Sequence, residues 1–364
     1  MKCFFLLAPL LAVLLLLPGC ARPENPSPSN GDDFPVDERQ SVAALEQSAT
    51  QLKRNGRGNV IEVSFRGAQI SDADLAPLTG LPELRSVLLN ETAISNQGLK
   101  TLGQLASVQN LDLRGCPVGN DGLAHLVGLK KLRALRLSGQ NNMTTVDDDG
   151  MVHVAHLTSL EVLAVDFLWV SETGLAQLDK LARLRELYLA QSTIGDDAMG
   201  LLGQFPNLKK LRISRNQVSD TGLEMLAKNA RLEDLDLSEN SLVSDEGFRH
   251  LAGMTSLKKL NLWRVSITDV GLEYLAGMVQ MESLNLDNSP ISDAGLVHLG
   301  KMKKLTFLHL GSTQVTDAGL DQLAGLTSLE DLRVTRTAVT EEGATRLREQ
   351  IPGIVIQLKY IEGH

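Results

Sequence analysis

The sequence predicts an α/β solenoid, a fold in which short strands and short helices alternate along a stack of similar coils. An isoleucine or valine recurs twelve times at one position of a repeating unit. Successive copies are 24 residues apart, except for one step of 28 and one of 25. A fixed period between about 20 and 50 residues is typical of a solenoid, whose units each pack on their neighbours. The positions are Ile70, Ile94, Val118, Val146, Val170, Ile194, Val218, Val243, Ile267, Ile291, Val315 and Val339.

Each repeat from Val60 onward begins with a short strand. Two apolar residues stand one residue apart, as in Leu187 and Leu189 or in Leu308 and Leu310. Alternation over so few residues is typical of a strand whose apolar side chains face the core. The residue between them is therefore expected to face outward, and a turn to the Ile/Val position follows.

A helical segment completes each repeat. An Asp, Asn or Glu stands two residues after every Ile/Val position, and Ser or Thr precedes it in nine of the twelve repeats. Such side chains accept hydrogen bonds from free N–H groups at a helix N-terminus. A glycine stands four residues after Ile/Val in ten repeats, with Asp74 and Ala198 as exceptions. Because a helical glycine costs about 1 kcal/mol relative to alanine, we expect a close backbone approach or a special conformation there.

A column of small polar residues stands two positions before Ile/Val. Its hydroxyl and amide groups are expected to hydrogen bond backbone groups between coils. Leu168 and Val265 interrupt this ladder locally. The column consists of Ala68, Thr92, Cys116, Thr144, Leu168, Ser192, Asn216, Ser241, Val265, Ser289, Thr313 and Thr337.

The beginning of the chain reads as an export signal. Lys2 precedes an apolar run that is too short to be a membrane span. The run ends in Leu17-Pro18-Gly19-Cys20, which resembles the lipobox of bacterial lipoproteins, although Pro18 departs from the usual small residue there. The resemblance implies that residues 1–19 are removed and that Cys20 carries the lipid. The alternative is a plain secretory signal.

The remaining boundaries follow from composition and pattern. Residues 20–36, rich in proline and serine, predict a flexible tether. Residues 37–59 predict an N-terminal cap, with one helix from Asp37 to Arg54. The repeats occupy residues 60–347. Residues 348–364 predict a cap strand and tail, in which Ile354, Ile356 and Leu358 face inward.

Composition and charge narrow the functional classes. The apolar fraction of 43% is ample for a core, and because aromatic residues make up 4%, that core is built from leucine. The formal net charge is −9 without a basic block, which argues against nucleic acid as the main ligand. Cys3 and Cys20 belong to the signal and its end, so Cys116 is expected to be a buried free thiol without a disulfide.

No catalytic constellation stands out. An acidic run closes the four-residue insertion, so a cation at Asn141–Asp149 stays open, although the spacing of a calcium loop is absent. His153 and His156 stand three residues apart, but a zinc site needs a third ligand that the sequence does not place. We predict no cofactor, no small-molecule substrate and no enzymatic activity, and we assign no metal site.

The repeat resembles the leucine-rich repeat family. The consensus Leu-x-x-Leu-x-x-Leu-x-Leu-x-x-Thr-x-Ile-Thr-Asp-x-Gly-Leu-x-x-Leu covers Val60 to Leu347, and its second half is closest to the cysteine-containing and GALA-like subclasses. The resemblance implies a right-handed solenoid of about twelve repeats, with a concave parallel sheet and short convex helices. It also implies a protein partner, because members of this family usually recognise proteins.

The outward residues of the strands are the candidate binding surface. Several are aromatic or cationic, which is the composition of interface anchors, although scattered exposed aromatics can also be without function. A second aromatic pair, Phe167 and Trp169, stands beside the insertion. The predicted partner-binding residues are Tyr188, Arg212, Asn261, Trp263, Arg264, Asn285, Phe307, His309 and Arg333.

These observations favour a lipid-anchored protein of the bacterial cell envelope, at the outer membrane or facing the periplasm, that binds a protein partner on its concave face. The membrane is expected to be contacted through the N-terminal lipid only. One alternative is a structural envelope spacer without a specific partner. Another is a ligase-type effector subunit, as in GALA-class proteins, but the chain has no room for the F-box that those proteins carry.

Overall fold

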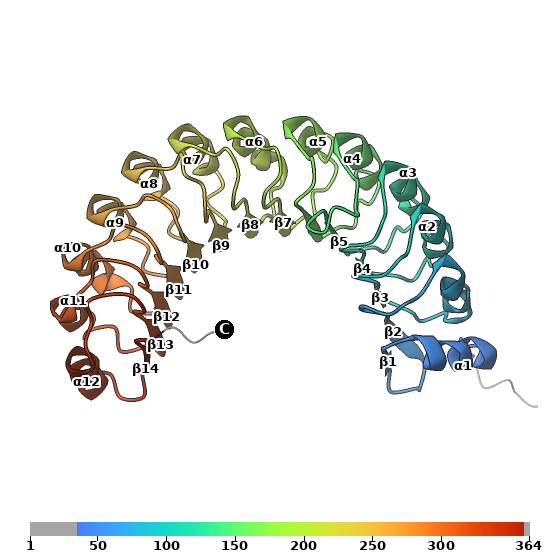
Figure 1. Cartoon of the computed structure of the whole chain (residues 1–364). Coiled ribbons are helices and arrows are strands. Elements are labelled where there is room, and N and C mark those ends of the chain that lie inside the picture. Colours follow the sequence, from blue (N-terminus) through green and yellow to red (C-terminus); the bar gives the residue numbers. More distant parts are fainter. Residues whose placement is uncertain (1–34, 360–364) are drawn as a thin grey trace, which may run out of the picture. The chain divides into compact units, whose positions relative to one another are not determined.

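The computed structural model describes residues 35–359. Within the compact unit Val36–His364, one 14-stranded sheet follows the order of the sequence, so each strand pairs with the next one along the chain. This unit curves into an arc with the strands on its inner side and the helices on its outer side (Figure 1). The predicted α/β solenoid is confirmed.

Strands of three to five residues alternate with short α-helices and 3₁₀-helices (η). The strands are β1 (Gln51–Arg54), β2 (Val60–Ser64), β3 (Ser86–Leu88), β4 (Asn110–Asp112), β5 (Ala134–Ser138), β6 (Val162–Asp166), β7 (Glu186–Tyr188), β8 (Lys210–Arg212), β9 (Asp234–Asp236), β10 (Lys259–Asn261), β11 (Ser283–Asn285), β12 (Phe307–His309), β13 (Asp331–Arg333) and β14 (Val355–Gln357). The helices are α1 (Arg39–Ser48), η1 (Asp72–Gly80), α2 (Asn96–Leu102), α3 (Asn120–Leu123), η2 (Ala124–Leu126), α4 (Asp148–Val154), α5 (Glu172–Ala176), α6 (Asp196–Leu201), η3 (Leu202–Gln204), α7 (Asp220–Leu226), α8 (Asp245–Leu251), α9 (Asp269–Leu275), α10 (Asp293–Leu296), η4 (Val297–Lys301), α11 (Asp317–Gln322) and α12 (Glu341–Gln350).

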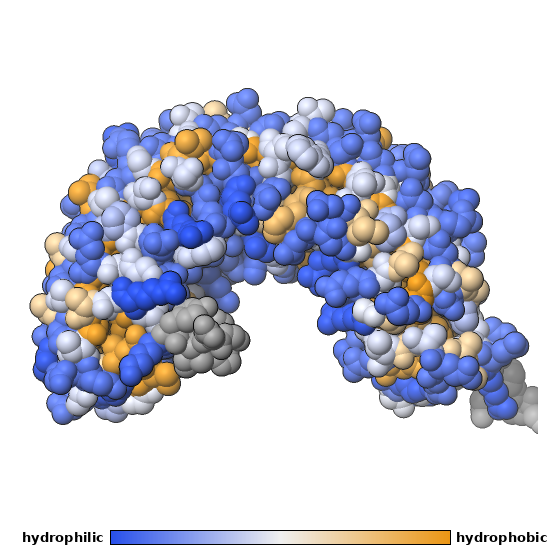
Figure 2. All heavy atoms as spheres, viewed as in Figure 1, coloured by the Kyte–Doolittle hydropathy of each residue, from blue (hydrophilic) through white to orange (hydrophobic). Residues whose placement is uncertain are grey.

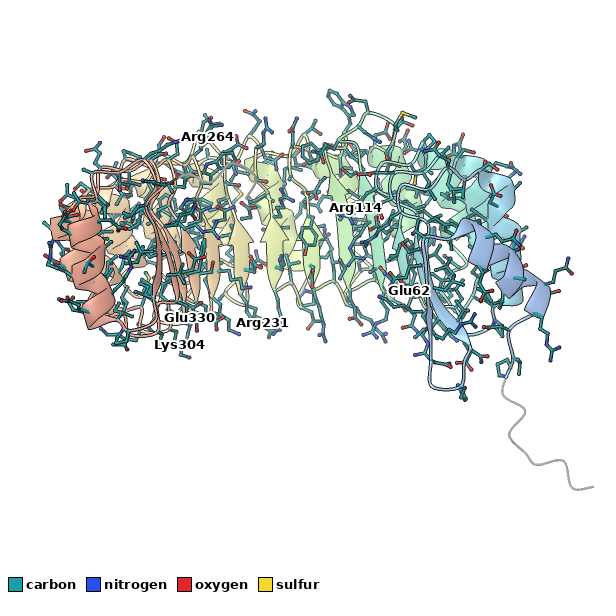
Figure 3. The ribbon with its side chains drawn as sticks, turned by 60° about the horizontal axis from the view of Figure 1, so that its bottom comes forward. Glu62, Arg114, Arg231, Arg264, Lys304 and Glu330 are labelled. Carbon is teal, nitrogen blue, oxygen red and sulfur yellow. The ribbon has the colours of Figure 1, made fainter. Side chains whose placement is uncertain are left out.

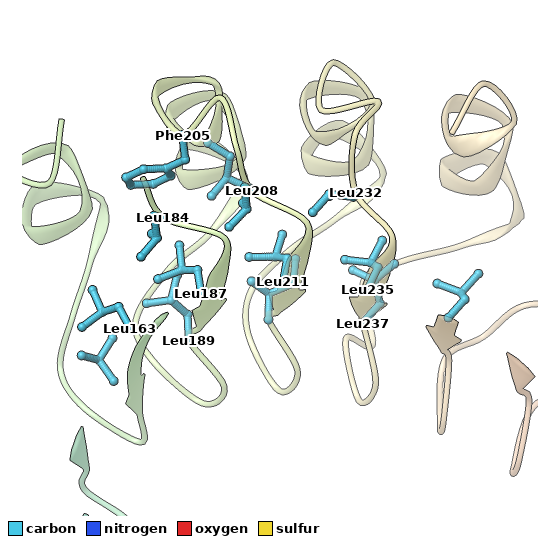
Figure 4. Close-up of a cluster of buried hydrophobic side chains, with 14 of the residues drawn as sticks. Leu163, Leu184, Leu187, Leu189, Phe205, Leu208, Leu211, Leu232, Leu235 and Leu237 are labelled. Atoms are coloured by element: carbon cyan, nitrogen blue, oxygen red, sulfur yellow. The ribbon is translucent and has the colours of Figure 1, made fainter. Parts of the chain in front are cut away.

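Leucine fills the space between the sheet and the helices. Leu187, Leu211 and Leu235 of successive coils stand in one row (Figure 4), and all three are fully buried. Burial of one leucine side chain contributes about 1.5–3 kcal/mol, so a row repeated along the array supplies most of the driving force for folding. Each coil buries its leucines against the coils on either side, which explains why one coil cannot fold alone.

The N-terminal cap differs from the prediction of one helix from Asp37 to Arg54. Helix α1 ends at Ser48, and Gln51–Arg54 form β1, which pairs antiparallel with β2. The physical reason is the open edge of β2, whose backbone N–H and C=O groups need partners that a helix cannot supply. The hairpin supplies them, and buried Leu45 of α1 joins the core.

The C-terminal cap matches its prediction. After α12, strand β14 pairs parallel with β13. Ile354 and Ile356 are buried, and Leu358 packs partly buried against the core. With α1 and the hairpin at one end and α12 and β14 at the other, the compact unit carries its own closed core, so residues 36–364 are expected to fold without the preceding segment.

Each strand from β2 to β13 is followed by a turn that contains a residue in the left-handed backbone conformation. Arg215, Glu239 and Arg264 have φ values of 57°, 58° and 56°. A non-glycine residue in this region costs roughly 1–2 kcal/mol. Hydrogen bonds between coils hold the turns in place: Arg215 N–H donates to Ser238 O at 2.9 Å, and Glu239 N–H donates to Trp263 O at 2.8 Å.

The polar column forms hydrogen bonds between coils in part, and one of its residues is shifted. The thiol of Cys116, which is buried and free, contacts Leu89 O of the preceding coil at 3.1 Å, whereas Thr92 Oγ1 donates to the same oxygen within its own coil at 2.7 Å. In the 25-residue step, however, the ladder residue is Asn240, which is fully buried and donates to Ile213 O at 2.9 Å. Ser241, placed there by counting back from Val243, is exposed, because the extra residue lies between ladder and valine.

The acidic column connects neighbouring coils. Asp196 begins α6, and its carboxylate accepts the N–H of Ser219 at 2.7 Å and the O–H of Ser219 at 2.5 Å in the next coil. Ser219 in turn caps its own helix, because its Oγ accepts Thr221 N–H at 3.2 Å. The Ser/Thr residue is therefore the N-cap, and the carboxylate accepts from the following coil, not from its own helix as the sequence suggested. We call this arrangement the carboxylate clasp.

The clasp explains the recurring glycine. A Cβ on Gly222 would collide with Asp196 Oδ1 of the preceding coil, and the corresponding glycines stand against the same oxygen of their own clasps. The close approach expected from the sequence is thus confirmed. The exception Ala198 follows Glu172, whose longer side chain reaches Gly195 N–H at 2.6 Å. The alanine at this position is therefore opposed by a glutamate, whose side chain is one methylene longer than that of the aspartates that oppose the glycines.

Among residues 35–359, no helix has both the length and the apolar character needed to span a membrane.

Gly295→Ala is expected to lower the free energy of unfolding by about 1–3 kcal/mol, because the added methyl overlaps Asp269 Oδ1. Adding Asp269→Glu is expected to recover about 1 kcal/mol, as the native pair of Glu172 and Ala198 indicates. A double-mutant cycle by urea denaturation measures the coupling.

The control for this cycle is Gly300→Ala, since a Cβ on Gly300 meets nothing within 4 Å. This variant is expected to be neutral or slightly stabilising. Strictly additive effects of the two substitutions at Gly295 and Asp269 would contradict the steric explanation of the glycine column.

Candidate binding surface on the concave sheet

The concave face consists of the outward residues of the parallel strands. Neighbouring strands pair without a register shift from β2 to β14, as in Tyr188 opposite Arg212 and Asn261 opposite Asn285. Equivalent side chains therefore form straight columns across the sheet. The central column contains Ser64, Leu88, Asp112, Arg136, Ala164, Tyr188, Arg212, Asp236, Asn261, Asn285, His309 and Arg333.

A hollow of about 380 Å³ lies on this face between β7 and β12. It brings together five of the nine residues predicted to bind a partner. Aromatic side chains stand at its two ends, and charged and amide groups line the space between them. The five residues are Tyr188, Arg212, Asn261, Asn285 and Phe307.

Tyr188 forms the N-terminal wall of the hollow. Its O–H donates to Glu186 Oε2 at 2.6 Å, and Lys210 Nζ lies 5.6 Å from the centre of its ring. Lys210 is itself paired with Asp234 at 2.9 Å. Burial, together with the hydrogen bond to Glu186, raises the pKa of Tyr188 to about 12. The ring is thus held as a neutral phenol in one orientation, which lowers the entropy cost of packing against it.

Arg212 stands beside Tyr188 between two carboxylates. Its guanidinium lies 3.8 Å from Asp166 and 3.5 Å from Asp236. Burial raises the pKa of the Asp166 carboxyl, although Ala190 N–H donates to it at 2.7 Å. The hollow is therefore lined by charges of both signs, with Lys210, Arg212 and Lys259 beside Asp234 and Asp236, which suits a partner that also presents both signs.

Asn261 and Asn285 lie side by side in the middle of the hollow. The Oδ1 of Asn261 accepts Trp263 N–H at 3.2 Å, and that of Asn285 accepts Asp287 N–H at 3.0 Å. These bonds fix both amides. The Nδ2 groups have no hydrogen-bond partner among residues 35–359, so four N–H donors are available to carbonyl groups of a bound chain.

The C-terminal wall is a stack of three side chains. Phe307 meets His309 edge to face, with the ring centres 6.4 Å apart, and the Arg333 guanidinium lies 5.1 Å from the Phe307 ring. Burial lowers the pKa of His309, so its imidazole is neutral at neutral pH. Arg333 pairs with Asp331 at 3.2 Å, yet its Nε is buried without a hydrogen-bond partner. A buried N–H without a partner is unfavourable and would gain from a bound acceptor.

Trp263 and Arg264 lie apart from the hollow. Arg264 occupies a turn at the end of the strands, on the upper edge in Figure 3, and its guanidinium lies 5.0 Å from the Trp263 ring. It also pairs with Glu239 at 3.3 Å. The predicted set therefore divides into a hollow with its C-terminal wall and a separate pair at the rim. Cys20 lies outside the described residues.

The second aromatic pair belongs to the flank at the strand ends. Trp169 is 76% exposed, Met143 of the insertion is 49% exposed, and Phe167 is partly buried with a φ of 60°. Figure 2 shows hydrophobic atoms gathered over this part of the arc, near β5 and α5. These residues form an apolar patch that is distinct from the concave hollow.

The sequence reasoning left Lys210, Asp234, Lys259 and Ser283 out of the predicted set, although they line the hollow. They precede the central column by two residues, and this spacing is the signal that could have found them. A second hollow of about 400 Å³ near the N-terminal end was also missed, and buried Asp112, paired with Arg114 at 2.6 Å, is among its lining residues.

Two of the three carboxylates at the insertion are engaged with protein groups. Asp147 accepts from Asn120 Nδ2 at 2.6 Å, and Asp148 forms the clasp to Ser171. Among residues 35–359, no three His, Cys, Asp or Glu side chains are grouped to hold a metal ion.

Comparison with known proteins gives the same repeat. A family model described as "Leucine Rich repeat" matches residues 104–127, 206–227 and 301–324. No curated protein matches the sequence.

Solved structures with similar folds come from bacteria and from yeast. An internalin of Listeria monocytogenes is 18% identical with a TM-score of 0.62, over 88% of this chain and 94% of that chain. A chain of the yeast Rad7–Elc1 complex is 19% identical with a TM-score of 0.54, over 79% and 83%. A leucine-rich-repeat protein of Leptospira interrogans is 19% identical with a TM-score of 0.51, over 78% and 80%. At these identities the likeness concerns the fold alone.

Tyr188 is expected to titrate near pH 12 in the folded protein, above the ordinary value of 10.0. Its neutral form is favoured by folding, so this contribution to stability is complete below pH 10 and is lost as the pH rises toward 12. Tyrosinate absorbance, with Tyr188→Phe as the reference, measures the titration.

Glu186→Gln is expected to lower the pKa of Tyr188, because it removes the negative charge that faces the phenol and accepts its hydrogen bond. Glu282→Gln removes a carboxylate outside the hollow and is expected to leave the titration unchanged. Titration of all tyrosines together near pH 10 in the folded protein would contradict the buried, hydrogen-bonded environment.

Proposed function

From the fold of a leucine-rich-repeat solenoid, we propose that this chain is a non-enzymatic binding protein of the bacterial cell envelope. It is anchored by a lipid on Cys20 and holds a protein partner on its concave sheet. A solenoid offers a long curved surface, which suits recognition of another protein. The similar yeast chain comes from a complex of two proteins, Rad7 and Elc1, which agrees with this use of the fold.

The observation that carries the proposal is the hollow between Tyr188 and Phe307. Its aromatic walls are fixed by hydrogen bonding and stacking. Between them stand the amide donors of Asn261 and Asn285, and in the C-terminal wall the buried Arg333 Nε also lacks a hydrogen-bond partner. Rigid aromatic anchors combined with unsatisfied donors are typical of the centre of a protein interface. The partner is expected to place backbone or side-chain carbonyls over Asn261 and Asn285.

The rim pair, Trp263 and Arg264, would contact the edge of a partner that fills the hollow. The spacer alternative requires no specific contact anywhere on the sheet. It therefore predicts that substitutions in the hollow leave the binding of every other protein unchanged.

The double variant Tyr188→Ala and Phe307→Ala is expected to lose at least tenfold in affinity for the partner, since truncation of interface anchors costs about 2 kcal/mol or more each. The partner is identified by capture from cell-envelope extracts on immobilised residues 36–364. The affinity of the purified partner is then measured for residues 36–364 with and without the two substitutions. Thermal melting checks that the double variant and its control variant both fold.

The matched control is Met143→Ala with Trp169→Ala, which removes exposed apolar side chains outside the hollow. It is expected to bind within about twofold of the unchanged chain. Equal loss in both double variants would move the site away from the hollow. Retained binding by the variant at Tyr188 and Phe307 would remove the proposed site, and a failure to capture any protein would favour the spacer.

The lipid anchor has its own test. Growth with an alkyne-bearing fatty acid is expected to label the exported full-length chain, and Cys20→Ala is expected to abolish the label and release the protein from the membrane fraction. Cys116→Ala serves as the control, because the thiol of Cys116 is buried and its pKa is raised by burial. Unchanged labelling of the Cys20 variant would contradict the lipoprotein proposal.

A further inference from the structure

The segments that lead from each helix to the next strand form one flank of the solenoid, and this flank is rich in exposed cations. None of the six named below forms an ion pair with a carboxylate of residues 35–359. Four of them stand at one repeat position, directly before a buried leucine, and so recur along the flank. The six are Lys131, Lys180, Arg183, Arg185, Arg231 and Lys304.

Some of the acidic residues on this flank are already neutralised. Glu161 pairs with Arg133 at 2.7 Å. Glu233 pairs with Lys209 and, at 2.7 Å, with Lys258, and their hydrogen bonds lower the pKa of Glu233 to about 2. Asp179, Glu282 and Glu330 in the same segments form no ion pair within residues 35–359, so the six unpaired cations exceed the unpaired carboxylates by three on this side of a chain whose formal net charge is −9.

The opposite flank is acidic. The helices begin there, and their first turns carry carboxylates such as Asp149, Glu172 and Asp197. In Figure 3, Arg231, Lys304 and Glu330 lie along the lower edge, and Arg264 of the strand-end turns lies along the upper edge. Arg264 there is paired with Glu239, so the helix starts give the upper edge its excess of carboxylates.

Helix dipoles do not account for the exposed cations. A helix C-terminus favours nearby cations, but the effect falls off beyond its last turn. Arg183 follows α5, which ends at Ala176, by seven residues, and Arg231 follows α7, which ends at Leu226, by five. Arg231 donates to Pro206 O at 3.0 Å and Lys304 donates to Gln280 Oε1 at 2.6 Å. These bonds leave both charges unneutralised, so neither helix dipoles nor ion pairs within residues 35–359 account for the row of cations.

We propose that this basic flank lies on an anionic phospholipid surface, with the acidic flank facing away from the membrane. The choice of a membrane as the occupant of this flank rests on the envelope location proposed above. It does not depend on the acylation of Cys20 or on the concave site. A spread row of exposed cations on flexible stems suits a fluid plane of headgroups. Single-stranded nucleic acid is instead bound on grooves with stacking aromatics, and the named cations are not interleaved with any.

Physical estimates support an orienting role. Each lysine or arginine close to an anionic bilayer raises partitioning about fivefold, because it contributes about 1 kcal/mol. An acyl anchor combined with a basic surface binds more firmly than either one alone. The acidic flank is repelled by the same headgroups, so one side-on orientation is favoured, and the open side of the concave hollow then faces along the membrane plane.

The test uses residues 36–364 and co-sedimentation with vesicles. Binding is expected to vesicles of phosphatidylcholine and phosphatidylglycerol in equal parts, but not to phosphatidylcholine alone. It is expected to disappear as salt rises, since the Debye length falls from about 10 Å at 0.1 M to about 3 Å at 1 M. The variant Lys131→Gln, Arg183→Gln, Arg231→Gln is expected to bind at least tenfold more weakly.

The matched control removes three cations from the convex helices: Lys100→Gln, Arg249→Gln and Arg348→Gln. It changes the net charge equally and is expected to bind within about threefold of the unchanged chain. Equal weakening in both variants, or no binding at 0.1 M salt, would overturn the proposal. Binding of duplex DNA, or self-association at low salt, that depends on the same three cations while vesicles stay unbound would also overturn it.

Discussion

The fold depends on the contact between one coil and the next, above all on the carboxylate clasp. An Asp at the start of one helix binds the N–H and O–H of the Ser or Thr that caps the following helix. The same carboxylate occupies the space that a Cβ of the recurring glycine would need. Because each coil contacts only its neighbours, the spacing set by this joint is repeated along the whole array. Hydrogen bonding lowers the pKa of Asp317, so at least this clasp carries its charge at neutral pH.

A regular joint on the convex side makes the concave side a set of columns. Parallel strands keep equivalent residues in register, so the chemistry of the inner face follows the order of side chains along each column. Between β7 and β12 those columns bring aromatic, amide and charged groups to one hollow. What the fold offers is a rigid arrangement of side chains at the strand spacing of about 4.8 Å.

The sequence predicted the solenoid, the strand register and both caps in outline, because these follow from a period and from alternation. It placed the end of α1 wrongly, since the need of β2 for an edge partner is a tertiary effect that outweighs local helical pattern. It chose Ser241 where Asn240 fills the ladder, because counting cannot say where an extra residue bulges. Of the predicted binding set, the hollow unites Tyr188 and Phe307 but not Trp263, since the direction of a side chain at a strand end depends on the turn.

The pair of Glu172 and Ala198 has a consequence for how such arrays change length. Most joints combine a short acid with a glycine, and this one combines a long acid with an alanine. Whole coils can therefore be duplicated or lost by recombination wherever both ends carry the common joint. A crossover that sets Ala198 behind an aspartate, or a glycine behind Glu172, joins mismatched parts. The junction between α5 and α6 thus marks a barrier within the array, and homologous repeats are expected to be exchanged on either side of it more readily than across it.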